Sequence, residues 1–292
     1  MPRLQRLLTR LSAVLPRDAA RLELKWLQQA AARDPRRDLD VMVDRRIDGE
    51  PLQYIIGTQP FGPLELLVRP PVLIPRPETE DWALRLAERV LPSVQRPVSL
   101  LDLCTGTGCI PLVLCRLCPA GSVSAYGVDI AEEAIALARE NARLHGIPEQ
   151  NTGGPALTNI FRPVLANMRD PAALISAGLR PPFDVITSNP PYIPKNEYDN
   201  LPPSVKDYED QRALLGDPEP GSSDGKGLTF YRDIAKLVAH HDFLARDGLL
   251  AVEVGAGQAR DVEQIFQGEG KLSKTEIWQD PWQVERVVLA RR

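Results

Sequence analysis

The chain has no long hydrophobic run and no overall excess of positive charge. Within its 292 residues, no apolar stretch approaches the roughly 18 residues that a membrane-spanning helix needs. The formal net charge is -4, whereas a dedicated nucleic-acid-binding domain usually carries a basic footprint. The sequence therefore argues against a membrane protein, and no direct nucleic-acid partner is expected. Its length suits one large domain, or a main domain with a smaller companion.

Cysteine is scarce and gathered in one place. Cys104, Cys109, Cys115 and Cys118 are the only cysteines of the chain. Disulfide bonds among them would require a strand–turn–helix segment to fold back on itself, so we expect reduced thiols. Their spacing matches no common zinc pattern, and no metal is expected. Reduced thiols indicate a reducing compartment, either the cytosol or the mitochondrial matrix.

Acidic residues are missing from the first seventeen positions. Basic residues stand at Arg3, Arg6, Arg10 and Arg17, and leucines at 4, 7, 8, 11 and 15 share one helical face. Such a basic amphipathic helix resembles a mitochondrial presequence and predicts a location in the mitochondrial matrix. The alternative is a native first helix of the front domain, which leaves a cytoplasmic location open.

The spacing of apolar residues predicts three parts along the chain. Residues 1–58 form a helical domain, because Leu22, Trp26 and Leu27, and further on Leu39, Met42 and Val43, recur at helical intervals. Residues 59–77 form an extended, hairpin-like connector, since six prolines surround the apolar stretch from Leu64 to Val68. Residues 78–292 form the main domain.

In the main domain, strand and helix patterns alternate, which predicts an α/β fold with a parallel sheet covered on both faces. Surface loops are expected at Asn151–Pro155 and Asp217–Gly227. We expect strands at Val98–Leu103, Val123–Asp129, Phe183–Ser188 and Gly248–Val254, and helices at Ile110–Leu117 and Ala131–His145.

A glycine turn, Asp102-Leu-Cys-Thr-Gly-Thr-Gly-Cys109, follows the first expected strand. Glycines at such a turn let the backbone approach a ligand closely. Asp129 ends the next strand, where its carboxylate can accept both ribose hydroxyls of a nucleoside. A dinucleotide site would need a third glycine where Pro111 stands. S-adenosylmethionine has no phosphate and needs only a loop that admits its methionine part.

The sequence Asn189-Pro190-Pro191-Tyr192 stands at the end of a buried strand, where polar residues line the ligand crevice. An amide nitrogen is a poor nucleophile, so a site that methylates it needs acceptors aimed at both N–H groups. The Asn189 side-chain oxygen can be one acceptor, and the Pro190 carbonyl, stiffened by successive prolines, the other. Tyr192 can stack on the flat amide.

These motifs resemble the PrmC/HemK family, the protein-(glutamine-N5) methyltransferases of class I peptide chain release factors. The resemblance covers about residues 20–292. Further matching segments are Gly49-Glu-Pro-Leu-Gln-Tyr-Ile55, Leu73-Ile-Pro-Arg-Pro-Glu-Thr-Glu80 and Glu253-Val-Gly-Ala-Gly-Gln258. The second of these is the most family-specific, because DNA methylases lack it.

The resemblance implies a seven-stranded, Rossmann-like class I methyltransferase domain with a helical front domain that helps to grip the release factor. It implies methyl transfer from S-adenosylmethionine to the glutamine of a Gly-Gly-Gln motif. The cofactor residues would be Asp102, Cys104, Thr105, Gly106, Thr107, Gly108, Asp129, Met168 and Asn189. Catalysis would fall to Asn189, Pro190 and Tyr192, and the substrate glutamine would lie against Asn189, Pro190, Pro191 and Tyr192. Arg76, Glu78 and Thr79 would shape the entrance.

Two departures from the family pattern bear on the site. Cys104 stands where the family usually has glycine, so this residue should not require a positive φ. Asn167-Met168 stands where an acidic residue and an aromatic are usual.

The basic leader suggests an organellar member that acts on a mitochondrial release factor. The alternatives are an adenine-N6 methyltransferase acting on DNA or RNA, and a binding protein that has kept the fold.

Overall fold

The structure is a computed structural model that describes residues 2–90, 97–150, 158–218 and 225–292. The loop expected at Asn151–Pro155 lies outside the described residues, as does the middle of the loop expected at Asp217–Gly227. Among the described residues, no helix is both long and apolar enough to cross a membrane.

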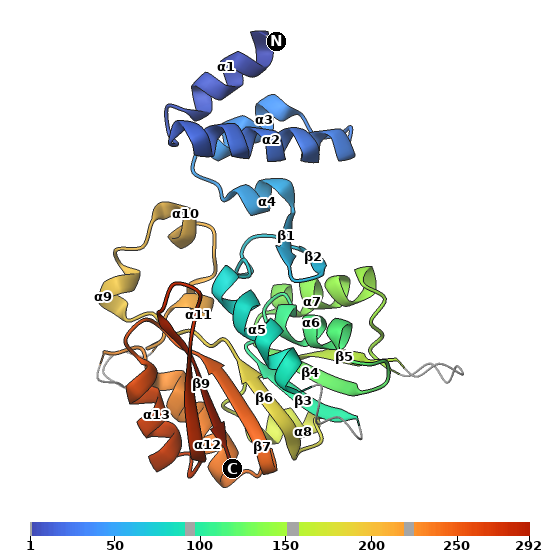
Figure 1. The fold of residues 1–292 in the computed structure, drawn as a ribbon, viewed down its shortest axis with the longest axis vertical. Helices are drawn as coiled ribbons and strands as arrows, with labels where there is room; N and C mark the ends of the chain where they lie inside the picture. The colour runs from blue at the N-terminus through green and yellow to red at the C-terminus, as the bar shows by residue number, and fades with distance from the viewer. Residues whose placement is uncertain (1, 91–96, 151–157, 219–224) are drawn as a thin grey trace.

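Four helices form a bundle at the N-terminal end: α1 (Pro2–Leu11), α2 (Arg17–Arg33), α3 (Leu39–Ile47) and α4 (Leu52–Ile56) (Figure 1). Leu7 and Leu11 of α1 are fully buried in an apolar cluster to which all four helices contribute, and α1 itself packs against α2 and α3. Arg3 and Arg6 pair with Asp40 of α3. Helix α1 is therefore packed as part of this bundle, and whether it also acts as a targeting segment stays a prediction.

The helix predicted around Leu22 and Trp26 is present as α2, but these two side chains lie on its outer face. Leu22 is 46% exposed and Trp26 41% exposed, whereas Leu24 and Leu27 are buried. Helical spacing shows that a helix forms. It does not show which of two apolar stripes faces a partner element, because that choice depends on the packing of α1, α3 and α4.

The predicted hairpin follows the bundle. Strand β1 (Thr58–Phe61) pairs antiparallel with β2 (Leu64–Leu67), and Phe61 and Leu66 are buried in the core of the main domain. The chain then runs through Pro70–Pro75 to α5 (Pro77–Val90), whose proline sits at the first helical position, where a missing N–H costs nothing.

The main domain is built on a sheet of seven strands in the order β5-β4-β3-β6-β7-β9-β8, and the predicted α/β class is confirmed. Strand β9 runs antiparallel to both of its neighbours, β7 and β8, and the other neighbouring pairs of these strands are parallel. The strands are β3 (Val98–Leu103), β4 (Val123–Asp129), β5 (Ile160–Leu165), β6 (Phe183–Ser188), β7 (Leu244–Glu253), β8 (Ser273–Gln279) and β9 (Glu285–Arg291). Strand β7 begins before the predicted Gly248, and a register shift against β6 separates the two parts.

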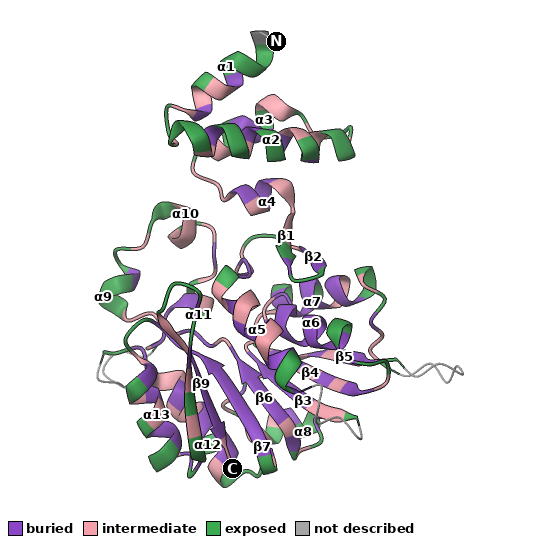
Figure 2. Ribbon diagram, viewed as in Figure 1, coloured by how far each residue is buried: buried purple, intermediate pink, exposed green. Residues whose placement is uncertain are grey.

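Helices cover both faces of the sheet, because its strands are apolar on both sides. Neighbouring residues of β7 show this: Leu249 contributes to the cluster under α5, α6 and α7, and Leu250 to the cluster under α8, α12 and α13. Figure 2 shows the central strands as buried. The helices are α6 (Cys109–Leu117), α7 (Glu132–Leu144), α8 (Pro171–Ser176), α12 (Thr229–His240) and α13 (Ala259–Gly268).

Three short helices cross over the carboxyl edge of the sheet after β6: α9 (Lys195–Tyr198), α10 (Pro203–Lys206) and α11 (Gln211–Leu214). Main-chain hydrogen bonds fasten this segment, from Ile193 N to Leu214 O at 2.9 Å and from Asp210 N to Pro71 O at 2.8 Å. The second bond joins the crossing segment to the connector, so both border the space at the ends of the strands.

Candidate active site

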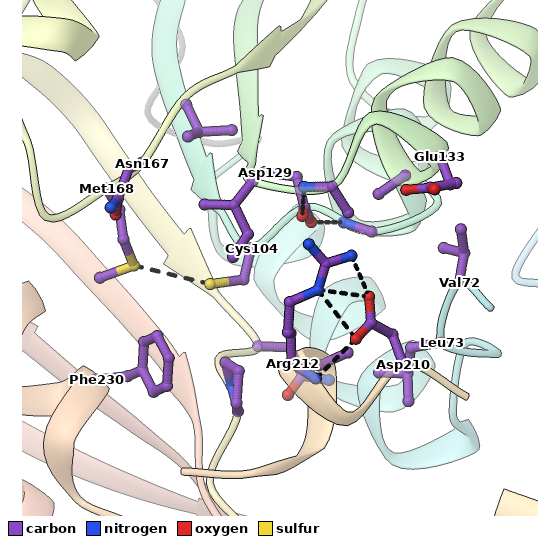
Figure 3. Close-up of a pocket in the computed structure, with 18 of the residues that line it drawn as sticks. Val72, Leu73, Cys104, Asp129, Glu133, Asn167, Met168, Asp210, Arg212 and Phe230 are labelled. Atoms are coloured by element: carbon purple, nitrogen blue, oxygen red, sulfur yellow. Dashed lines mark hydrogen bonds and ion pairs between the residues drawn. The ribbon is translucent and has the colours of Figure 1, made fainter. Parts of the chain in front are cut away.

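A cavity of about 320 Å³ opens at the carboxyl ends of the parallel strands (Figure 3). Parallel α/β sheets bind ligands at this edge. Six of the predicted site residues line the cavity: Cys104, Gly106, Asp129, Met168, Asn189 and Pro191. They come from the ends of four strands, β3, β4, β5 and β6, so residues up to 87 positions apart meet here.

Asp129 joins the two predicted cofactor motifs. Its Oδ2 accepts a hydrogen bond from the Gly106 N–H at 2.9 Å, and its Oδ1 accepts one from the Ala131 N–H at 3.0 Å. Burial raises the pKa of its carboxyl above the usual value. Each carboxylate oxygen keeps a further lone pair, so Asp129 can still accept hydroxyl donors from the cavity.

Asp102 does not line the cavity. It is fully buried, and its two oxygens accept hydrogen bonds from Thr105 Oγ1 at 2.6 Å and from Thr187 Oγ1 at 2.7 Å. Burial raises its pKa to about 7. The predicted residues Thr105, Thr107 and Gly108 also lie behind the wall, with both threonines buried. These four residues shape the turn that faces the cavity rather than the cavity surface itself.

The expectation that Cys104 needs no positive φ is wrong. Cys104 has a φ of 58°, in the left-handed region that a residue with a Cβ adopts at a cost of about 1–2 kcal/mol. The turn imposes this angle, because the next amide, Thr105 N, donates to Val128 O at 3.0 Å while the Thr105 side chain reaches back to Asp102. The Cys104 thiol faces the cavity and lies 3.8 Å from Met168 Sδ.

The cavity wall beyond the motifs is mostly apolar. Met168 and Phe230 lie on one side of the cavity, with Val72 and Leu73 of the connector on the other (Figure 3). Apolar surroundings of this kind suit an adenine ring, and they include the predicted Met168. Phe230 was not predicted, since a phenylalanine in the first turn of α12 carries no local signal of ligand contact.

Charged groups from the crossing segment complete the cavity. Asp210 caps α11 and accepts hydrogen bonds from the Arg212 guanidinium on both carboxylate oxygens, and Figure 3 shows this pair facing Asp129. Arg76 of the connector pairs with the buried Glu209 of the crossing segment and so fastens the two together. Arg76 was predicted to shape the entrance, and the structure has it as the tie between the connector and the crossing segment.

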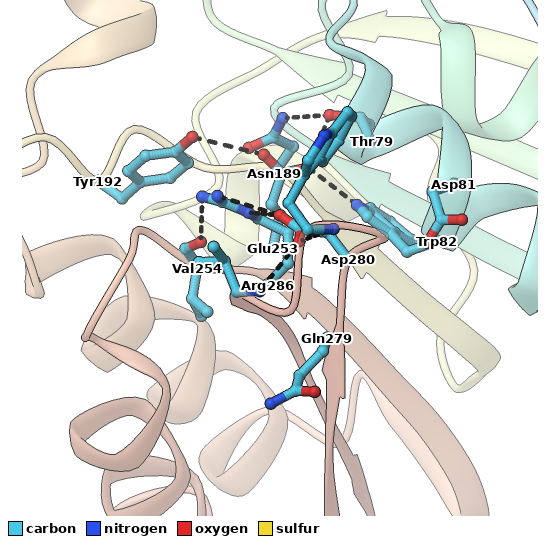
Figure 4. Close-up of polar contacts among 12 residues, drawn as sticks. Thr79, Asp81, Trp82, Asn189, Tyr192, Glu253, Val254, Gln279, Asp280 and Arg286 are labelled. Carbon is cyan, nitrogen blue, oxygen red and sulfur yellow. Dashed lines mark hydrogen bonds and ion pairs between the residues drawn. The ribbon is translucent and has the colours of Figure 1, made fainter.

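The Asn-Pro-Pro-Tyr corner lies between this cavity and a buried polar cluster (Figure 4). Asn189 Nδ2 donates to Thr79 Oγ1 at 3.2 Å. The Tyr192 hydroxyl donates to Glu253 Oε1 at 3.5 Å, and its main-chain carbonyl accepts from Gln258 Nε2 at 2.9 Å. Hydrogen bonds to α5, β7 and the turn after β7 therefore fix the position of the corner.

Two oxygens of the corner have no such partner. Among the residues that the structure describes, no hydrogen bond uses Asn189 Oδ1 or the Pro190 carbonyl. Pro190 and Pro191 are buried, so the corner is rigid. These are the two acceptors that the sequence predicted for a substrate amide, and that role stays a prediction.

Close packing of glycine explains further details of the site. A Cβ on Gly227 would lie 2.1 Å from the Tyr192 carbonyl oxygen, and one on Gly127 2.6 Å from Thr105 Oγ1. A Cβ on Gly106 would instead meet nothing within 4 Å. The first two glycines let the corner and the turn approach their neighbours, and Gly106 leaves the cavity side of the turn open.

The chain is similar in sequence to curated bacterial proteins over nearly its whole length. A Geobacter sulfurreducens protein named release factor glutamine methyltransferase is 37% identical, across 93% of this chain and 89% of that protein. Proteins of the same name from Thermodesulfovibrio yellowstonii and Rhodospirillum rubrum are 33% and 37% identical, across 86% and 87% of this chain and 80% and 68% of their own.

The chain belongs to the release factor glutamine methyltransferase family. No protein-family model matches it. Among solved structures it resembles a methyltransferase from Pyrococcus furiosus with a TM-score of 0.49 and 15% identity, across 79% of this chain and 89% of that one. As a member of the family, the chain is an S-adenosylmethionine-dependent methyltransferase.

The cavity of this family member fits that cofactor. Asp129 has lone pairs that would accept ribose hydroxyls, Met168 and Phe230 would present apolar faces to an adenine ring, and the open side of Gly106 would leave room for the methionine part. Burial raises the pKa of the Cys104 thiol, so the one thiol at the cavity stays protonated and is no competing nucleophile.

The sequence did not predict the polar cluster of Glu253, Thr79 and Trp82 that lies behind Asn189. Glu253 is buried, with 1% exposure, at the end of β7, and it bonds to Thr79 and to Trp82 Nε1. A signal existed, because Glu253 is the only charged residue from Leu249 to Val254 and it ends a parallel strand at the ligand edge.

Proposed function

We propose that this enzyme methylates the side-chain amide nitrogen of the glutamine in the Gly-Gly-Gln motif of a class I peptide chain release factor. The observation that carries the proposal is the rigid Asn189–Pro190 corner, of which Asn189 lines the cavity and whose two oxygens, Asn189 Oδ1 and the Pro190 carbonyl, have no hydrogen-bond partner among the described residues. A primary amide has two N–H donors and therefore matches two convergent acceptors. The names of the relatives support the same substrate.

The corner contributes by orienting the substrate nitrogen. When both amide N–H groups donate to Asn189 Oδ1 and the Pro190 carbonyl, the nitrogen cannot turn away from the cavity. When bound, S-adenosylmethionine supplies an electrophilic methyl group. Fixed orientation of this kind can lower a barrier by up to about 7–11 kcal/mol. The methylated nitrogen then loses one proton to water, so no side chain has to act as a base.

Tyr192 completes the corner as a neutral residue. Burial raises the pKa of its hydroxyl, so the group stays protonated and donates to Glu253. The ring is thereby held beside Asn189 (Figure 4), where it can cover the face of a substrate amide.

The test is methyl transfer in vitro with isotope-labelled S-adenosylmethionine and a purified class I release factor. We expect the label on the glutamine of the Gly-Gly-Gln motif, located by mass spectrometry. A release factor with glutamate at that position should receive no label, because a carboxylate has no N–H group to donate. Asn189→Ala should abolish transfer while the dissociation constant for the cofactor stays within about threefold.

Two outcomes would contradict the proposal. Transfer to DNA or RNA but not to the release factor would favour the adenine-N6 alternative, which uses a similar nitrogen. Cofactor binding without transfer to either class of substrate would favour a binding protein that has kept the fold.

The location of the enzyme is a separate proposal. The basic helix at the N-terminus favours the mitochondrial matrix, with a mitochondrial release factor as substrate. A cytoplasmic location is supported instead by the burial of Leu7 and Leu11, because both side chains pack in the core of the helical bundle. Fusion of residues 1–17 to a fluorescent protein separates the two: import into mitochondria supports the matrix, and diffuse fluorescence contradicts it.

A further inference from the structure

Glu253 accepts two strong hydrogen bonds on one of its oxygens. Thr79 Oγ1 lies 2.6 Å and Trp82 Nε1 lies 2.8 Å from Glu253 Oε2. Both donors belong to α5, and the carboxylate ends β7, so the cluster joins segments more than 170 residues apart. A buried carboxylate with 1% exposure needs such donors, because it has lost its water.

The Thr79 hydroxyl has only one proton, and it donates this proton in the hydrogen bond to Glu253. A hydroxyl that donates its proton can only accept from any other partner. Its partner on the other side is the Asn189 side chain, so the atom facing Thr79 must be the amide nitrogen, at 3.2 Å. The oxygen and nitrogen of an asparagine amide diverge from the same carbon atom, and with Nδ2 facing Thr79, Oδ1 is therefore turned away from Thr79.

The other oxygen of the same carboxylate holds the second residue of the corner. Glu253 Oε1 accepts from the Tyr192 hydroxyl at 3.5 Å, and Figure 4 shows Asn189 between Tyr192 and Thr79. One buried group thus orients both polar side chains of the Asn-Pro-Pro-Tyr sequence, although it does not line the cavity itself.

We propose that Glu253 and Thr79 are positioning residues that select one of the two amide orientations of Asn189, the one that presents Oδ1 to the substrate. Without the Thr79 acceptor, the asparagine amide can rotate by half a turn and present Nδ2 instead. A substrate N–H would then face another N–H, and the site would lose one of its two acceptors. The substrate part of this inference rests on the proposed function, whereas the orientation of Asn189 does not.

The first experiment needs no substrate. The side-chain amide protons of Asn189 are assigned in an NMR spectrum by their loss in Asn189→Asp, and their exchange with solvent is measured. Thr79→Val keeps the shape of the side chain but removes the acceptor, so exchange should speed up by at least about tenfold, equivalent to about 1.4 kcal/mol. Thr79→Ser keeps the hydroxyl and should restore slow exchange. Equal exchange rates and shifts in the wild type and Thr79→Val would overturn the proposal.

The second experiment separates turnover from binding. In Thr79→Val, kcat for the release factor should fall about 10- to 100-fold while the dissociation constant for S-adenosylmethionine stays within threefold. Thr79→Ser should recover most of the lost kcat. Glu253→Gln should also lower kcat, because its amide cannot accept at both ends.

Thr275→Val is a matched control for these variants. Thr275 Oγ1 donates to Glu263 at 2.7 Å, so the change again removes a threonine–carboxylate hydrogen bond, but on the edge strand β8 and outside the cavity. Its kcat should equal that of the wild type. A wild-type kcat in Thr79→Val would overturn the positioning role and leave the proposed function intact. A wild-type enzyme inactive on the release factor would overturn the proposed function, and the exchange experiment would still decide the orientation.

Discussion

The Gly106 N–H donates a hydrogen bond to Asp129 Oδ2 across 2.9 Å, and this bond locks the glycine turn after β3 to the carboxylate after β4. The two groups are 23 residues apart in the chain, and both line the cavity. Parallel pairing of β3 with β4 brings them together, since Leu103 is opposite Val128 at the ends of the two strands. The turn and the carboxylate therefore form one unit.

Replacing Asp129 should disable this unit. Asp129→Ala removes the carboxylate that is predicted to accept the ribose hydroxyls, and it leaves the Gly106 N–H without its partner. We expect the dissociation constant for S-adenosylmethionine, measured by isothermal titration calorimetry, to rise by at least tenfold, or about 1.4 kcal/mol. Asp170→Ala is the control, because Asp170 also accepts a backbone N–H, as the cap of α8, without lining the cavity. Equal affinities in the two variants would contradict the role of Asp129.

Gly127 should tolerate no side chain. A Cβ there would lie 2.6 Å from Thr105 Oγ1 and 2.7 Å from the ring of Phe161, which is fully buried and cannot move aside. Gly127→Ala should lower the free energy of unfolding in urea by about 2–3 kcal/mol. Gly268→Ala, at the end of α13 with open space around it, should leave stability unchanged or raise it slightly. A neutral Gly127→Ala would show that the turn is not packed as described.

The positive φ of Cys104 predicts an unusual order of variants. Glycine relieves the strain of the left-handed conformation but is more flexible in the unfolded chain, so Cys104→Gly should stay within about 1 kcal/mol of the wild type. Cys104→Val places a β-branched residue at the same φ and should be less stable by about 2–3 kcal/mol. Thermal unfolding of the two variants tests this order, and equal melting temperatures would argue against a left-handed Cys104.

The raised pKa of Asp102 makes stability depend on pH. The folded protein holds a proton on Asp102 up to about pH 7, whereas the unfolded chain releases it near pH 4. The stabilising contribution of this group is therefore complete below about pH 4 and is lost as the pH rises to about 7.

Urea unfolding at pH 5 and pH 8 measures the effect. From pH 5 to pH 8, the free energy of unfolding should fall by about 2–3 kcal/mol more in the wild type than in Asp102→Asn, because the asparagine does not titrate. Other buried carboxyls such as Glu253 are present in both proteins, so their contribution to the pH dependence of stability cancels when the two are compared. Parallel pH dependences would show that Asp102 is ionised throughout.

Much of the fold follows from local patterns in the sequence. The strands β3, β4 and β6 and the helices α6 and α7 lie within one or two residues of their predicted bounds, because apolar periodicity and glycine turns act over short distances. The meeting of Asp129 and Asn189 at one edge also follows, since parallel strands bring their carboxyl ends together.

Other features arise only from contacts between distant segments. The left-handed Cys104 depends on Val128 and Asp102, and the outward face of Trp26 depends on how α2 packs in the bundle. The link from Glu253 through Thr79 to Asn189 joins three segments that no local pattern relates. The sequence by itself determined which residues stand at the ends of the strands. Only the tertiary structure decided which way their side chains turn, because burial allows each polar group just the partners that other segments bring within reach.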